Sequence, residues 1–419
     1  MSESTNLLRI ISNHQGLNMS NQSLDEKQKN VATLCEQYLQ KLVNKLKQQS
    51  EVNDSSDPCD ADSSCAAEIQ LWNQLKKYIE THEGSLINCI HGFYVYILQV
   101  LYSLIKGPAM DLYFIRCKFV DDVKLKEADK LLFYNIYIRL GDLNRYLKNL
   151  KVSRYYYYQA CEIDPSRGHA YNQLALVTTS QVFNSLYYSV RALMATDDPI
   201  KMAKNNIDSL VNRCSLMNPN IEPLFLNDSS IIDADRVENW LHFIVIAIYC
   251  EKLKIVLPYL IKELDKNLTI EPKKPNENIL IPKFDTKWIF SAMDVAIDII
   301  LSHPSDEKLS SIELDKELSD IKGKLTILLK DKTCTADKVG LALKHDYLLY
   351  GFSPLKEAHK VLSFSEPLDD LLNTQLLLLR INEKLEKLIV LTNERKVKNR
   401  VKKSRNIALQ SILGSKGSS

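Results

Sequence analysis

A repeat-like pattern around residue 150 limits the possible folds more than any other feature of the sequence. Aromatic, Leu, Gly, Ala and Pro positions occur there at fixed offsets: Tyr137, Leu140, Gly141, Tyr157, Ala160 and Pro165. Small residues at such offsets let two helices pack closely, and Pro closes the unit. The pattern therefore predicts a pair of packed helices. It begins again at Tyr171, and this second unit is partial.

The spacing is that of a tetratricopeptide unit, with a period of about 34 residues. The composition agrees with a helical chain, because the 419 residues include only 11 Gly and few runs alternate with period two. Hydrophobic residues make up 45% and charged residues 25%, an ordinary globular balance. The net charge of +2 argues against a protein dominated by binding to a phosphate backbone.

Two helical domains are expected at this length. The predicted domains are residues 1–217 and 218–412, with a flexible tail at 413–419. Within the first, residues 48–65 are rich in Ser and Asp and predict an acidic, disordered loop, in which Cys59 and Cys65 would lie. In the second, helices are expected at roughly 232–250, 252–266, 284–303, 306–330, 333–345 and 366–392. The segment Arg395–Arg405 holds seven Lys or Arg and predicts a terminal helix with a solvated basic face.

Catalytic motifs are absent from the sequence. It contains no H-E-x-x-H, G-x-S-x-G, Walker loop or G-x-G-x-x-G, and its eight His are scattered without i, i+4 pairs. The prediction is therefore a chain that is not an enzyme and has no catalytic residues, metal site or cofactor. The apolar runs Gly92–Ile105 and Trp240–Cys250 fall short of the ~20 residues of a membrane helix, so core helices and no membrane are expected.

Three strings carry a family resemblance. The main one runs L-G-D-x-x-R-Y from Leu140, Y-Y-x-x-A from Tyr156 and P-S-x-G-x-x-Y-N-Q-L-A from Pro165. It resembles the core of the SMG five/six/seven (Est one-like) family of nonsense-mediated mRNA decay factors. Leu71-Trp72-Asn73 is similar to an early L-W-N of that family. The segment Tyr350–Leu355 resembles its R-G-F-x-P-L element and favours the SMG five branch.

The resemblance implies an all-α fold, with a 14-3-3-like/tetratricopeptide N-terminal domain followed by stacked α-helical hairpins. It implies a non-enzymatic adaptor in nonsense-mediated mRNA decay, cytoplasmic and able to shuttle to the nucleus. The expected partners are an SMG seven-like paralogue, forming a heterodimer, the phosphorylated RNA helicase of the pathway and protein phosphatase 2A. The alternatives are a telomerase-associated factor that binds RNA or single-stranded DNA, and a generic helical scaffold.

The resemblance also assigns a phosphopeptide site. Arg145 would be the main phosphate clamp, because its planar guanidinium can pair two phosphate oxygens. Tyr146 would donate a hydrogen bond to the same group, Lys77 would be the second basic residue with Lys76 as its alternate, and Asn172 would hold the ligand backbone.

Each of these residues also has a plain structural interpretation. Arg145 could only pair with Asp142 at i, i+3, Tyr146 could belong to the core, and the two Lys could lie on a solvated helix face. Asn172 could only brace the start of its helix. One departure bears on the site: the region 81–85, where 14-3-3-type pockets carry a further basic residue, has neither Lys nor Arg.

Overall fold

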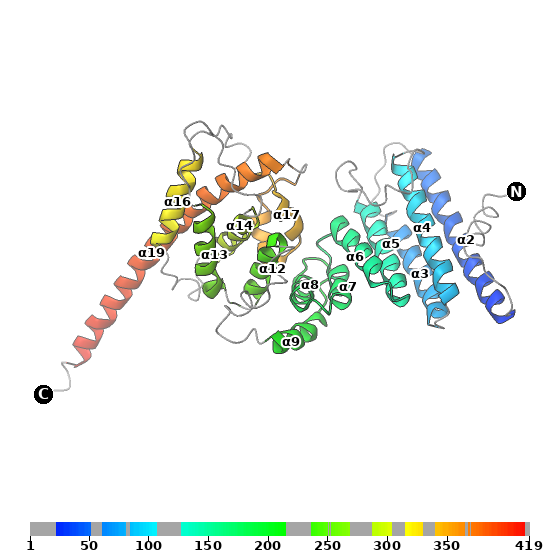
Figure 1. Ribbon diagram of the computed structural model, residues 1–419, viewed down its shortest axis with the longest axis horizontal. Helices are drawn as coiled ribbons and strands as arrows, with labels where there is room; N and C mark the ends of the chain where they lie inside the picture. Colours follow the sequence, from blue (N-terminus) through cyan, green and yellow to red (C-terminus); the bar gives the residue numbers. More distant parts are fainter. Residues whose placement is uncertain are drawn as a thin grey trace. The chain divides into compact units, whose positions relative to one another are not determined.

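The computed structural model describes residues 22–51, 61–80, 84–106, 127–214, 236–249, 251, 253–268, 287–303, 315–329, 340–364, 368 and 370–414. All regular elements in these ranges are helices (Figure 1), which confirms the predicted all-α class. The chain divides into two compact units, Met1–Gln181 and Val182–Ser419, and each has a core of its own.

The first unit is a stack of helices centred on α5. Its described helices are α2 (Gln22–Glu51), α3 (Ala61–Ile79), α4 (Gly84–Lys106), α5 (Glu127–Tyr146), α6 (Leu150–Ile163) and α7 (Gly168–Val177). Helix α5 packs against α3, α4 and α6, while α2 covers α3 and α4, and α7 follows α6. This arrangement leaves the end of α5 beside the short α5–α6 turn, where the resemblance places the site.

Helix α4 holds the most apolar stretch of the first unit. By length and composition alone its residues Gly84–Tyr102 could cross a membrane. In the structure Phe93 and Tyr94 are buried, and their rings lie 6.3 Å from Tyr38 and 5.9 Å from Trp72. Edge-to-face contacts of this kind stabilise a packed core, as predicted for the apolar run that begins at Gly92.

The predicted pair of packed helices is the α5–α6 hairpin. Ser153 Oγ donates a hydrogen bond to the carbonyl oxygen of Gly141 at 2.8 Å, so the two backbones approach closely. The ring of Tyr157 fills the space where a side chain at position 141 would stand. Small residues at these positions are what the close approach requires, and this hairpin is the tetratricopeptide-like unit expected from the sequence.

The second unit is built around α14. Its described helices are α8 (Val182–Leu193), α9 (Ala203–Cys214), α12 (Arg236–Tyr249), α13 (Leu253–Asn267), α14 (Lys287–Ser302), α16 (Asp315–Leu329), α17 (Lys344–Leu349), η5 (Ser353–Leu355), α18 (Lys356–His359) and α19 (Asp370–Gly414). Helix α14 packs against α12, α13, α18, α19 and η5. Its residues Ala292, Met293, Ala296 and Ile297 are fully buried.

The Tyr350–Leu355 element connects the end of α17 to the end of α8. Gly351 has φ 72°, a conformation that favours glycine. Phe352 forms an isolated antiparallel bridge with Ala195, and its side chain is buried. The buried Arg191 donates to the carbonyl oxygens of Leu348 and Tyr350 at 3.0 and 3.1 Å. In this chain the motif therefore has a structural role inside the second unit.

Several predicted boundaries differ from the structure. The loop predicted at 48–65 is wrong at both ends, because α2 continues to Glu51 and α3 begins at Ala61. Cys65 is accordingly buried in α3, where it accepts a hydrogen bond from Asn135 Nδ2 at 3.0 Å. An apolar face that packs against α5 extends the helix into a polar sequence. Residues 52–60, which include Cys59, lie outside the described residues.

The C-terminal helices also differ in extent. The helix predicted at 333–345 is wrong at 340–343, which are not helical, while its last two residues begin α17, which runs over Lys344–Leu349. The helix predicted at 366–392 continues without a break to Gly414 and includes the predicted basic terminal helix. The predicted domain boundary at 217/218 lies outside the described residues, and the two compact units divide at 181/182, which puts α8 and α9 in the second unit. Residues 415–419 of the predicted tail also lie outside the described residues.

Candidate phosphate site and a buried charge network

Arg145 lies in the last turn of α5 and is partly exposed, with 31% of its side chain accessible. Its Nη2 lies 3.2 Å from Asp142 Oδ1, and its Nε donates to the hydroxyl of Tyr157 at 3.4 Å. The guanidinium carbon is 4.6 Å from the ring centre of Tyr146. Among the described residues Nη1 has no partner, so one edge of the guanidinium remains available to an anion.

Asp142 and Tyr157 hold the other edge of this guanidinium. The Tyr157 hydroxyl donates to Asp142 Oδ1 at 2.7 Å, the same oxygen that faces Arg145. Burial and the negative charge of Asp142 raise the pKa of Tyr157. Burial lowers the pKa of Arg145, but the hydrogen bond to Tyr157 and the charge of Asp142 outweigh it, and the net shift is upward. The i, i+3 pair with Asp142 is thus present, and the guanidinium stays charged.

Lys76 and Lys77 are exposed near the end of α3. Helices α3 and α5 run parallel, because Cys65 contacts Asn135 and, further along both, Glu68 pairs with Arg139. Continuing this register by about two turns brings the Lys pair to the level of the last turn of α5. A shared site of Lys76 and Lys77 with Arg145 stays a prediction.

Asn172 lies in α7 at a partly buried position. The amide of Ala170 donates to the hydroxyl of Tyr134 at 3.0 Å, which fixes the start of α7 beside the first half of α5. Tyr134 precedes Arg145 by about three helical turns. Asn172 makes no direct contact with Arg145 among the described residues, and its part in a shared site stays a prediction.

A further basic residue near this site is already engaged. Arg139 Nε lies 3.0 Å from Glu68 Oε1, and Tyr94 donates to the same carboxylate oxygen at 3.0 Å. Burial lowers the pKa of Arg139, and the Glu68 charge and hydrogen bond raise it above its usual value. Only 13% of the Arg139 side chain is accessible, and its Nε and Nη2 both pair with Glu68, so this guanidinium is less available to a ligand than that of Arg145. Of the three predicted basic residues, Lys76 and Lys77 are exposed and Arg145 is partly exposed.

The Tyr155–Tyr158 run is divided between core and surface. Tyr157 is fully buried, and Tyr156 lies 6.2 Å from the ring of Tyr137. Tyr158 is exposed. Packing, rather than a stacking platform for bases, accounts for Tyr156 and Tyr157.

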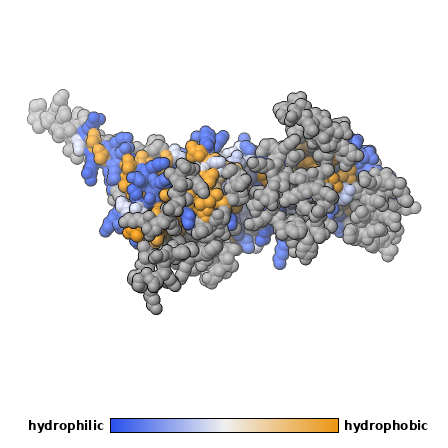
Figure 2. Space-filling model, turned by 90° about the horizontal axis from the view of Figure 1, so that it is seen from above, coloured by the Kyte–Doolittle hydropathy of each residue, from blue (hydrophilic) through white to orange (hydrophobic). Residues whose placement is uncertain are grey.

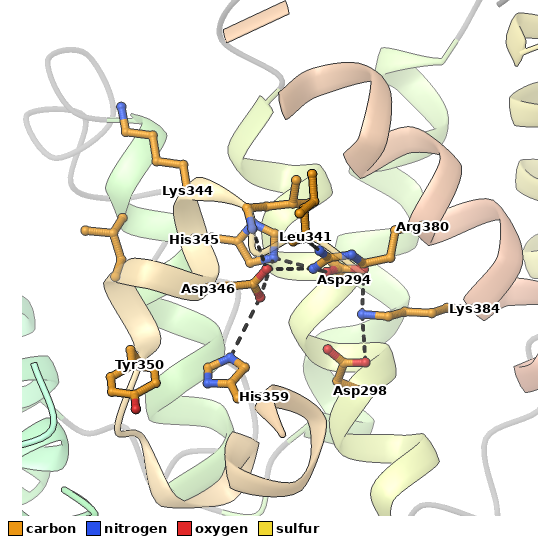
Figure 3. Close-up of polar contacts among 12 residues, drawn as sticks. Asp294, Asp298, Leu341, Lys344, His345, Asp346, Tyr350, His359, Arg380 and Lys384 are labelled. Atoms are coloured by element: carbon orange, nitrogen blue, oxygen red, sulfur yellow. Dashed lines mark hydrogen bonds and ion pairs between the residues drawn. The ribbon is translucent and has the colours of Figure 1, made fainter. Parts of the chain in front are cut away.

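A network of buried charges in the second unit was not predicted from the sequence. Its side chains come from α14, α17, α18 and α19: Asp294, Asp298, His345, Asp346, His359, Arg380 and Lys384 (Figure 3). Arg380 Nη1 lies 2.7 Å from Asp346 Oδ2 and 3.4 Å from Asp294 Oδ2. Lys384 Nζ lies 2.8 Å from Asp294 Oδ1 and 2.7 Å from Asp298 Oδ1.

The two cations control the pKa values of the carboxyl groups around them. Burial raises the pKa of Asp294, but Lys384, the His345 hydrogen bond and Arg380 lower it well below its usual range. At the edge of the network, the effect of burial on Asp298 is larger than the opposing effect of Lys384, and the pKa of Asp298 rises to about 6. Burial lowers the pKa of His359 to about 4, although the Asp346 charge opposes that shift.

Part of the network has donors suited to a metal ion. Ligand atoms of Asp294, His345 and Asp346 lie within 4.8 Å of one another. Arg380, however, already pairs with both carboxylates, and His345 Nε2 lies 3.0 Å from Asp294 Oδ2. A metal ion would have to displace the guanidinium from a buried site. The donor set therefore fits an ion-pair network that joins helices, rather than a metal centre.

Comparison with known proteins gives two similarities. A family model described as "Est1 DNA/RNA binding domain" matches residues 153–284. No curated protein matches the chain. A solved structure titled "Structure of the C. elegans SMG5-SMG7 complex" is similar at 16% sequence identity and a TM-score of 0.42, over 89% of this chain and 99% of that chain. The matched segment begins within α6 and ends before α14, so Arg145 and the charge network both lie outside it.

Proposed function

We propose, from the premise that the chain is Est1-like over residues 153–284, that it is a non-enzymatic adaptor of nonsense-mediated mRNA decay. In this role it binds a phosphorylated protein with the end of α5. Its partners are an SMG seven-like paralogue, with which it forms a heterodimer, and the phosphorylated helicase of the pathway. The pair recruits a phosphatase or decay enzymes to the marked transcript.

The observation that carries the proposal is the partly exposed Arg145, whose Nη1 has no partner among the described residues. Asp142 and Tyr157 fix the other edge, so the guanidinium is ordered before a ligand arrives. A phosphate group carries about −1.5 to −2 charge at neutral pH and accepts several charge-assisted hydrogen bonds. Lys76 and Lys77, at the same level along α3, add positive charge.

The competing carboxylate of Asp142 sets the expected strength of binding. It already neutralises Arg145 in part, and like charges repel, so an incoming phosphate meets a weakened cation. Binding by this site alone is therefore modest. A paralogue that supplies a second phosphate pocket would raise the overall affinity through a multivalent complex.

The test is fluorescence anisotropy of the full chain with a panel of peptides that each carry one central phosphoserine, alongside unphosphorylated twins. We expect binding only to phosphorylated peptides, and at least a tenfold loss in Arg145→Glu. Lys76→Glu with Lys77→Glu should weaken the same peptides. Lys204→Glu, at an exposed position of the second unit, is the matched control and should change nothing. Equal binding of both peptide forms, or unchanged binding in Arg145→Glu, would refute the proposal.

Nucleic acid is the second candidate ligand, favoured by the description of the matched family. On this alternative an RNA or single-stranded DNA oligomer binds the full chain with a steep dependence on salt. The same anisotropy assay separates the two functions. Oligomer binding without phosphopeptide binding supports this alternative and excludes the adaptor site.

A further inference from the structure

Helix α19 has two halves that differ in their surroundings. In the first half Leu376, Leu377, Ile381, Leu385 and Leu388 are buried, and the helix packs against α14 and α16. The red C-terminal part continues past α16 (Figure 1). From Val390 onward the described hydrophobic side chains are exposed or only partly buried. Packing within the second unit therefore explains the first half of α19 but not the apolar side chains of its second half.

Three valines lie on one side of the second half of α19, with the exposed Glu394 between Val390 and Val397 on the same side. Val390, Val397 and Val401 are 53%, 59% and 48% exposed. Steps of seven and four residues keep them on one side of a helix, over roughly 16 Å. Figure 2 shows hydrophobic atoms between hydrophilic ones on this part of the chain. Because valine favours helices less than most residues do, an exposed valine stripe gains nothing for an isolated helix.

The same half carries a dense positive charge. The segment Arg395–Arg405 contains seven Lys or Arg and no Asp or Glu. Lys396 and Arg400 are exposed at i, i+4, where like charges destabilise a helix. Lys398 and Arg405 are also exposed. The second half of α19 thus has two unfavourable features in the isolated chain, an exposed apolar stripe and self-repelling charge.

These two features together discriminate between classes of occupant. A nucleic acid would neutralise the charge but leave the valines in water. A second copy of this helix would cover the valines but double the positive charge. An amphipathic helix with an apolar stripe between acidic flanks relieves both, and it is the occupant that fits.

We propose that the second half of α19, Val390–Arg405, is a docking helix for an amphipathic partner helix that carries Asp and Glu on both sides of an apolar stripe. The partner packs its apolar residues against the valines at helical spacing. Its carboxylates face Lys398, Arg400 and Arg405. The inference stands apart from the phosphate site, because it uses a different unit and a different ligand.

The probe for the test is a synthetic four-heptad helical peptide with Leu at its apolar positions and Glu on both flanks. Its affinity for the full chain is measured by anisotropy. We expect binding of this peptide, none of a twin with Ser at the apolar positions, and none of a twin with Lys on the flanks. Val397→Ser with Val401→Ser should weaken binding at least tenfold. Lys398→Glu with Arg400→Glu should do so as well and gain affinity for the Lys-flanked twin.

Matched controls keep the outcome interpretable. Val361→Ser changes another exposed valine, and Lys204→Glu another exposed lysine, and both should leave binding unchanged. An RNA oligomer and the oligomeric state by light scattering are measured in parallel. Failure of the Glu-flanked peptide to bind overturns the proposal. RNA binding that depends on Lys398 and Arg400 but not on the valines overturns it too, and so does self-association through the valines.

Discussion

Gly141 lies so close to the ring of Tyr157 that a Cβ at this glycine would stand 2.3 Å from Tyr157 Cε1 and 2.5 Å from Cδ1. Real Cβ atoms do not approach other atoms so closely. The ring cannot retreat easily, because Tyr157 is fully buried and its hydroxyl is hydrogen-bonded to Asp142. The contact also positions the aromatic hydroxyl that holds Arg145, so packing and site geometry are linked here.

The first prediction is that Gly141→Ala destabilises the first unit. Overpacking of this kind typically costs about 1–3 kcal/mol. The measurement is the free energy of unfolding from urea titration followed by circular dichroism. Gly92→Ala in α4 is the control, since a Cβ there meets nothing within 4 Å, and Ala in a helix interior is favoured by up to about 1 kcal/mol. Equal stability of the two variants would contradict the packing argument.

The second prediction concerns Asp142→Asn. This variant removes the carboxylate that competes with a ligand phosphate for Arg145, while an amide oxygen can still accept from Tyr157. An ion pair of this exposure contributes up to about 1 kcal/mol, so phosphopeptide affinity should rise roughly threefold. Peptide titration of the variant at fixed ionic strength measures the change. A fall in affinity with an unchanged unfolding transition would show that Asp142 itself supports the bound state.

The third prediction is that Arg380→Met strongly destabilises the second unit. The variant leaves Asp294 and Asp346 buried without the guanidinium that pairs them. Removing one partner of a buried pair costs about 3–5 kcal/mol. Lys322→Met is the control, because Lys322 is partly exposed and its partner Glu386 is 65% exposed, and such a surface pair contributes about 0–1 kcal/mol. Chemical denaturation of both variants tests the contrast.

The fourth prediction is a loss of stability on acidification through His359. Its pKa is about 4 in the folded chain against 6.5 for an imidazole in water, so the unfolded state binds the proton more tightly. The stability it supports is full above pH 6.5 and is lost as pH falls toward 4. Between pH 7.5 and pH 5 this amounts to about 2 kcal/mol. His359→Phe, which keeps a ring beside Tyr350, should flatten the profile.

Asp298 supplies a comparison of opposite sign. Its pKa is raised to about 6, so the stability it supports is present at low pH and is lost as pH rises through 6. Because of Asp298, the free energy of unfolding should fall by about 1 kcal/mol between pH 5 and pH 7.5. In Asp298→Asn this fall should be absent. If both variants shift the pH profile in the same direction, the assignment of the two groups is wrong.

The helical class and the α5–α6 hairpin could be predicted from the sequence because their signals are local. Gly141, Ser153 and Tyr157 lie on the two consecutive helices of one hairpin. Their spacing along the sequence is therefore enough to predict that these helices pack closely. The loop boundaries could not be predicted in the same way. The sequence around residue 62 is polar, and only its contact with α5, at Cys65 and Asn135, makes it helical.

The charge network was beyond sequence analysis for a related reason. His345 and Asp294 are separated by 51 residues, and Arg380 and Asp346 by 34. Each charged residue by itself is typical of a solvated surface. Only the packing of α14, α17 and α19 brings them into one buried cluster. The adjacency of His345 and Asp346 was the single local signal, and it is common in sequences without such a cluster.

The two hydrogen bonds that Arg191 donates to backbone carbonyl groups have a consequence for how the chain folds during synthesis. Its acceptors, the carbonyl groups of Leu348 and Tyr350, lie 157 and 159 residues further along. A growing chain thus exposes the α8 guanidinium to water until most of the second unit has left the ribosome, and such distant closure is slow. A fragment cut at residue 284 would keep the matched segment 153–284 but lack the carbonyl groups of Leu348 and Tyr350, so its α8 should be less stably packed than in the full chain.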